Sequence, residues 1–131
     1  MVKSRVLIAD DSPVARQMLI RLLVEEPDIV VTGEVGTAQS CVMILSEVDA
    51  DVLILEAAIN GASSVMRIIR ECRLINPRLK VILAVDANAT ADDVIMRGVD
   101  DIIGKPYVKS YVLRSIRGLC ENFARVSDDA S

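Results

Sequence analysis

Four charged residues in this sequence stand where a short apolar run has just ended. Asp10 and Asp11 follow the first such run, Glu56 follows the third, and Lys105 follows the fifth. Oxygen ligands suit a hard cation such as Mg²⁺, and a lysine can offset the charge of a phosphoryl group. If the fold brings these side chains together, they can hold a metal ion or take part in phosphoryl chemistry.

The same four residues also have an interpretation that needs no ligand. Asp10 and Asp11 stand just before a Ser-Pro pair, a place where acidic side chains cap helices. Lys105 can pair with Glu56 as a structural ion pair. Both interpretations, a binding pocket and a purely structural cluster, therefore stay open at this stage.

The elements that position these residues alternate regularly along the chain. Strands are predicted at 6–9, 29–32, 52–55, 81–85 and 102–103. Helices are predicted to begin at Pro13, Thr37, Ser63, Thr90 and Lys109, and the first four end by Pro27, Val48, Pro77 and Gly98. Five strand–helix repeats with short connections predict a three-layer α/β fold, a five-stranded parallel doubly wound sheet with five helices. Ligands bind such sheets at the carboxyl ends of the strands, which is where the four charged residues lie.

Composition narrows the class of protein. The 131 residues fit one domain, predicted at 1–126, with a polar, frayed tail at 127–131. The net charge of -4 argues against direct nucleic-acid binding, and the absence of histidine removes imidazole bases and the commonest zinc sites. No run is suited to span a membrane or to direct secretion, so we expect a cytoplasmic protein.

The three cysteines are predicted to be packing residues. Cys41, Cys72 and Cys120 lie far apart in the sequence and lack the spacing of metal ligands. Each falls in a predicted helix, and free cysteine behaves there as a small apolar side chain in a reducing compartment.

Three motifs resemble those of response regulator receiver domains. Val-Leu-Ile-Ala-Asp-Asp-Ser-Pro-Val-Ala-Arg at 6–16 is similar to the opening of these domains, and Asp-Val-Leu-Ile-Leu-Glu at 51–56 resembles their phosphoacceptor strand. Lys105-Pro106 resembles their Lys-Pro pair, whose peptide bond is usually cis. The resemblance covers essentially the whole chain and implies a flavodoxin-like sheet with strand order 2-1-3-4-5. The stretch 27–38 is most similar to receivers that precede methylesterase or DNA-binding output domains.

The resemblance implies a role for each residue of the acidic rim. Asp10 and Asp11 would bind Mg²⁺ with the acceptor side chain at position 56 and the backbone carbonyl of Ala58. Lys105 would contact the phosphoryl group. We expect the metal to bind weakly, because Lys105 can satisfy the same negative charge.

The sequence departs from the family pattern at the positions that carry the phosphorylation switch. Glu56 stands where the acceptor aspartate is expected, and Val85 stands where a switch hydroxyl is expected. Ile102 replaces the aromatic switch residue, Asn60 replaces a proline, and Ser63-Ser64 replaces a common Asp-Gly. These differences predict an atypical receiver that has lost the usual response to phosphorylation.

We therefore expect a non-enzymatic receiver-type domain of two-component signal transduction that works without phosphorylation. It would bind protein partners or control an output domain outside this sequence. Two alternatives stay open: a conventional receiver that takes a phosphoryl group from a histidine kinase with Mg²⁺, with Asp10 or Asp11 as an improvised acceptor, and a small-molecule sensor.

The output surface is predicted on the fourth helix, fifth strand and fifth helix. It carries acids and bases together: Asp92, Asp93, Asp100, Asp101, Arg97, Lys109, Arg114 and Arg117. Such mixed charge suits a homodimer, in which acids of one copy meet bases of the other. It equally suits a charged partner protein or a plain solvated surface.

Overall fold

A single parallel sheet forms the centre of the computed structural model, which describes residues 2–59, 61, 64–86 and 98–129. Its strands are β1 (Ser4–Ala9), β2 (Ile29–Val35), β3 (Val52–Glu56), β4 (Lys80–Asp86) and β5 (Asp101–Lys105). They lie in the order β2-β1-β3-β4-β5, with every neighbouring pair parallel. The predicted strand order is therefore confirmed.

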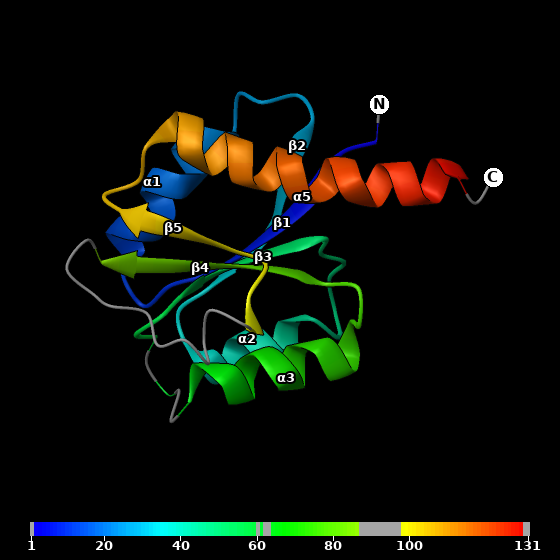
Figure 1. Cartoon of the computed structure of the whole chain (residues 1–131). Helices are drawn as coiled ribbons and strands as arrows, with labels where there is room; N and C mark the ends of the chain where they lie inside the picture. The colour runs from blue at the N-terminus through cyan, green and yellow to red at the C-terminus, as the bar shows by residue number, and fades with distance from the viewer. Residues whose placement is uncertain (1, 60, 62–63, 87–97, 130–131) are drawn as a thin grey trace.

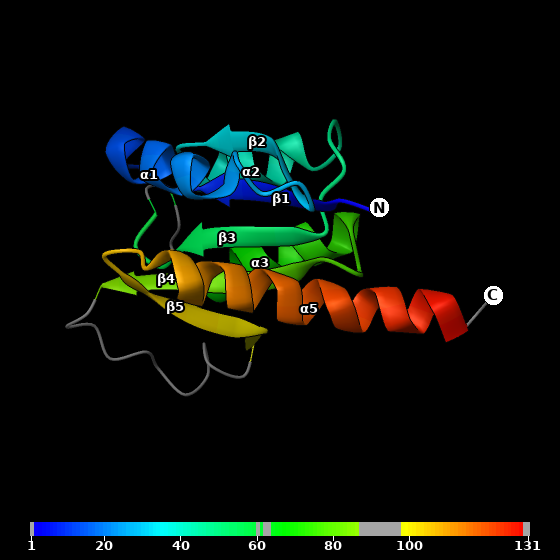
Figure 2. The same cartoon turned by 90° about the horizontal axis from the view of Figure 1, so that it is seen from above.

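Helices cover both faces of the sheet (Figure 1). They are α1 (Pro13–Leu23), α2 (Ala38–Ile44), α3 (Val65–Ile75) and α5 (Lys109–Asp129). Helices α1 and α5 lie on one face, and α2 and α3 lie on the other, as Figure 1 and the turned view in Figure 2 show. The described residues thus contain four helices where five were predicted. The fifth, expected from Thr90 to Gly98, lies outside the described residues except for Gly98 itself, because 87–97 are not described. No helix among the described residues has the length and apolar character needed to cross a membrane.

Several element boundaries differ from those predicted. Strand β2 continues to Val35, because Gly33 and the two residues after it pair with β1 beyond a register shift next to Val6. Pairing with a central strand here outweighs the weak strand preference of glycine. Helix α5 runs to Asp129, into the segment predicted as a frayed tail, since adding residues to an established helix needs no new nucleation step.

The core divides into two apolar clusters, one on each side of the sheet. Leu7, Leu53 and Leu83 belong to the cluster under α2 and α3, and their neighbours Ile8 and Ile54 belong to the cluster under α1 and α5. This alternation is the period of two that a strand imposes on its side chains. Strand β3 is buried along its whole length, so the carboxylate of its last residue is held inside the molecule.

Candidate functional site

The first part of the site is the turn that follows β1. The Asp10 side chain is almost fully buried, and its Oδ1 accepts a hydrogen bond from the Ser12 backbone N–H at 2.9 Å. The backbone of Asp10 is also fixed, because its N–H donates to the Val35 carbonyl and its carbonyl accepts from Arg16 Nη1. Ser12 caps α1 by accepting from the Ala15 N–H at 3.2 Å. The Asp10 carboxylate is therefore held in place without being the cap itself.

The second part is Glu56, the last residue of β3, which is 5% exposed. Its Oε1 accepts from the Ala58 N–H at 3.2 Å, and its Oε2 forms an ion pair with Lys105 Nζ. The structure thus joins Ala58 to the site through its N–H. The proposed metal-ligand role of the Ala58 carbonyl stays a prediction.

Lys105, the last residue of β5, brings the two acids together. Its Nζ donates to Asp10 Oδ2 at 2.8 Å while it pairs with Glu56, so one ammonium group bridges two buried carboxylates. The Lys105–Pro106 peptide bond is cis, as the family resemblance implies. Asp10, Glu56 and Lys105 therefore meet at one rim of the sheet, and Asp11 lies half-buried beside Asp10 in the sequence.

Tyr107 is a member of the site that sequence reasoning missed. Its hydroxyl donates to Asp10 Oδ2 at 3.5 Å, and the Lys105 ammonium lies 5.8 Å from the centre of its ring. Its place two residues after Lys105, beyond a proline, was the available signal. The direction in which the chain turns after Pro106 decides whether the ring reaches the rim, and spacing alone does not give that direction.

Burial and hydrogen bonding set the charge of the cluster. Burial by itself lowers the pKa of Lys105, but its hydrogen bonds to Asp10 and Glu56 outweigh burial and raise that pKa above its usual value. Burial raises the pKa of the Tyr107 phenol. At neutral pH the site therefore holds an ammonium between two acids, next to an uncharged phenol.

The arrangement does not fit a divalent cation as it stands. The carboxylates of Asp10 and Glu56 already accept from backbone N–H groups, and Lys105 donates to Asp10 and forms an ion pair with Glu56. Within the described part of the chain, no group of three or more acidic, cysteine or histidine side chains is arranged to hold a metal ion. A metal would have to displace the Lys105 ammonium, which already forms ion pairs with both acids.

The two residues predicted at switch positions pack on the other side of the sheet from the Glu56–Lys105 pair. Val85 and Ile102 contact the cluster under α2 and α3. Glu56 and Lys105 continue the alternation of Ile54 and Ile103, which belong to the cluster under α1 and α5. Val85 has no hydroxyl, so it offers the rim no side-chain hydrogen bond.

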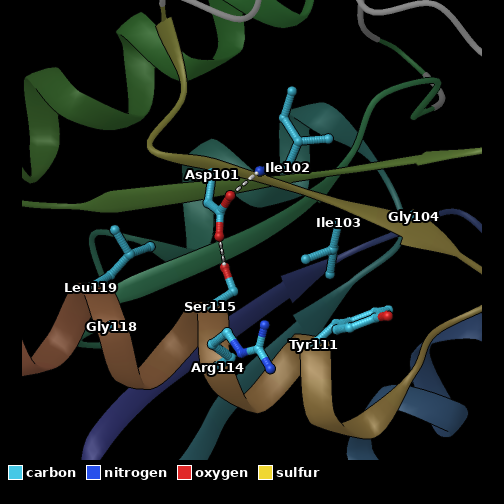
Figure 3. Close-up of a pocket in the computed structure, with 9 residues that line it drawn as sticks. All are labelled: Asp101, Ile102, Ile103, Gly104, Tyr111, Arg114, Ser115, Gly118 and Leu119. Atoms are coloured by element: carbon cyan, nitrogen blue, oxygen red, sulfur yellow. Dashed lines mark hydrogen bonds between the residues drawn. The ribbon is translucent and has the colours of Figure 1, made fainter.

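A hollow of about 340 Å³ lies apart from the acidic rim, between β5 and α5 (Figure 3). Its floor includes Asp101, whose Oδ2 accepts from Ser115 Oγ at 2.5 Å, and its border includes Tyr111 and Arg114 of α5. None of Asp10, Glu56 and Lys105 lines it. The hollow therefore belongs to the surface predicted for partner binding.

Residues 6–117 match the family model described as the response regulator receiver domain. A protein-glutamate methylesterase/protein-glutamine glutaminase of Rhodospirillum rubrum is 31% identical over 109 residues, which are 78% of this chain and 27% of that protein. One from Myxococcus xanthus is 32% identical over 107 residues, 79% of this chain and 30% of that protein. The chain thus spans less than a third of these relatives.

Solved structures show the same fold. The response regulator domain of Thermotoga maritima CheB superposes with a TM-score of 0.77 at 21% identity, covering 89% of this chain and 96% of that one. The REC domain of AraT from Geobacillus stearothermophilus superposes with a TM-score of 0.81 at 21% identity, covering 97% and 99%.

Proposed function

We propose that this chain, which belongs to the response regulator receiver domain family, is a regulatory module that works without aspartyl phosphorylation. One observation carries the proposal. Glu56 ends β3, where the family pattern places an acceptor aspartate, and its carboxylate is already paired with Lys105. The position meant to receive a phosphoryl group thus holds a longer acid that the protein itself neutralises.

Geometry makes Glu56 a poor acceptor. The extra methylene carries its carboxylate about 1.5 Å further from the backbone than that of an aspartate. Phosphoryl transfer needs an in-line arrangement, and a displacement of about 1 Å can cost roughly a hundredfold in rate. Attack by Oε2 would also require breaking the ion pair with Lys105, a contact made in a buried site.

The Lys105–Glu56 contact also resembles the contact that the lysine would make with a bound phosphoryl group. In the family pattern the lysine contacts the phosphoryl group, and here Lys105 contacts the Glu56 carboxylate instead. Val85 and Ile102 lack the hydroxyl and the aromatic ring that would report this contact to the rest of the domain. We infer that the domain holds one conformation rather than two.

Partners would bind the surface formed by β5 and α5. Strand β5 is an edge strand of the sheet, and Tyr111 on α5 is 60% exposed. Two of the charges predicted for this surface are engaged inside the chain: Arg117 pairs with Glu26 and Asp28, and Asp100 pairs with Arg73. Among the described residues predicted for this surface, Asp101, Lys109 and Arg114 then supply its mixed charge. Asp101 also accepts a hydrogen bond from Ser115, and Arg114 lies over the Tyr111 ring.

The partner is either a separate protein or an output domain, and a second copy of this chain stays an option. The curated relatives are named as methylesterases and glutaminases. We propose that this chain contributes regulation and no catalysis of its own, and that any enzymatic output belongs to another polypeptide segment.

The test is incubation with acetyl phosphate and Mg²⁺, followed by intact mass measurement. The natural chain should gain no phosphate. Glu56→Asp should gain one slowly, because Asp10, Asp11 and Lys105 are retained, whereas Glu56→Gln is the matched control and should gain none. A one-phosphate adduct on the natural chain would support the conventional receiver instead, and mapping would then show whether Asp10 or Asp11 accepts it.

A further inference from the structure

Two thiols that are distant in sequence face each other in the core. Cys41 of α2 and Cys72 of α3 are 31 residues apart, and their Sγ atoms lie 4.0 Å apart. Both side chains are fully buried. We propose that Cys41 and Cys72 are a redox-convertible dithiol, which closes to an intramolecular disulfide when a small-molecule disulfide oxidises it.

The geometry requires only a small movement. A disulfide has an S–S distance of about 2.05 Å, so each sulfur needs to approach by about 1 Å, within reach of a side-chain rotation. The thiols belong to the apolar cluster under α2 and α3, which also contains Ala38, Ile68 and Ile69. No third metal-binding side chain joins them among the described residues. Oxidation is therefore the chemistry that this pair supports best.

The short helix α2 provides a route for the oxidant. It has seven residues, Ala38–Ile44, and is capped by Thr37, whose Oγ1 accepts from the Ser40 N–H. A helix of this length is marginal without tertiary packing, so local opening of α2 costs less than global unfolding. Such an opening exposes Cys41 and uncovers Cys72 beneath it.

The reaction is a thiol–disulfide exchange in two steps. The thiolate of one cysteine attacks oxidised glutathione, forms a mixed disulfide and releases one reduced glutathione. The second protein thiolate then attacks the mixed disulfide and releases the other. Two protein thiols are oxidised, and one glutathione disulfide is reduced to two thiols.

The bond would fasten α2 to α3 and enclose the chain between them, which includes β3 and Glu56. Cross-linking a loop of this length reduces the freedom of the unfolded chain, so the oxidised protein should unfold at a higher temperature. Cys120 is a natural comparison, because it lies on α5, across the sheet from both α2 and α3.

The experiment incubates the folded natural chain in glutathione buffers of increasing oxidised fraction. Free thiols are then alkylated under denaturing conditions, and the intact mass is measured. We expect one alkylated thiol instead of three, so the intact mass should be lower than that of the reduced, alkylated chain by two alkyl labels and two hydrogens, with peptide mapping joining Cys41 to Cys72. Dithiothreitol should restore three free thiols and return the melting temperature to that of the reduced protein.

Variants separate the dithiol from general oxidation. Cys120→Ala keeps the pair and should lose the same mass with no thiol left to alkylate. Cys41→Ala and Cys72→Ala should form no intramolecular disulfide. Cys120→Ala also lacks one thiol, so its disulfide shows that losing a thiol does not by itself prevent the reaction. Three free thiols in the oxidised natural chain, pairing that involves Cys120, or a bond that forms only in denaturant would overturn the proposal.

Discussion

The acidic rim and the β5–α5 surface differ in burial and in how many of their charged side chains are paired within the chain. At the rim, Lys105 bridges Asp10 and Glu56, and all three side chains are largely buried. On the β5–α5 surface, Tyr111 and Arg114 border an open hollow. The carboxylates of the acidic rim are thus engaged by a lysine of the same chain, whereas the β5–α5 surface exposes side chains around an open hollow. This difference agrees with the proposal that the domain binds partners without being phosphorylated.

The sharpest way to break the comparison is Lys105→Met. It leaves two buried carboxylates without their counter-ion, so we expect a loss of about 3–5 kcal/mol in the free energy of unfolding, measured by urea denaturation. Adding Glu56→Gln should recover part of that loss. Lys109→Met, at an exposed lysine, is the matched control and should change stability little. A loss below about 1 kcal/mol for Lys105→Met would show that the rim is not held by this ion pair.

Alkaline pH tests the same cluster with a smaller effect. The folded-state pKa values of Lys105 and Tyr107 are both raised above their ordinary values near 10. Folding favours the protonated form of each group, so its contribution is complete below about pH 10 and is lost as the pH rises further. The melting temperature should fall between about pH 10 and 11.5, and less steeply in Lys105→Met. An equal slope in both proteins would contradict this assignment.

Magnesium should perturb the rim only weakly. The Lys105 ammonium occupies the place between the acids, so backbone NMR shifts near Asp10 and Glu56 should not saturate at low micromolar metal. Lys105→Met, where it folds, should bind the metal more tightly because both carboxylates lose their internal cation. Saturation of the natural chain at low micromolar Mg²⁺ would mean that the lysine yields readily.

The β5–α5 surface should give the smallest change in stability. Tyr111→Ala removes an exposed ring, so the free energy of unfolding should change by no more than about 0.5 kcal/mol, while self-association or partner binding weakens. Adding Mg²⁺ with beryllofluoride, a phosphoryl mimic, should leave association affinity unchanged within tenfold, which is about 1.4 kcal/mol. A larger shift would show that the rim and this surface are still coupled.

The site was predictable where it depends on the ends of strands. Asp10, Glu56 and Lys105 each follow an apolar run, and parallel strands bring their carboxyl ends to one rim, so these residues were expected to meet. The sequence left open whether Lys105 serves a ligand or an ion pair, and the observed contacts favour the ion pair. It placed Tyr107 two residues after Lys105 but did not show that the side chain turns back toward Asp10.

The sequence by itself determined the alternation of strands and helices, because the spacing of apolar residues is a local property of the chain. Its family motifs also determined the strand order. Only the tertiary structure decided which distant side chains touch. Lys105 meets Asp10 across 95 positions, and Cys41 meets Cys72 across 31. Arg117 turns to Glu26 and Asp28 rather than outward to a partner. Such contacts depend on how helices pack on the sheet and which rotamers fit between them, and the spacing of residues along a chain does not specify either.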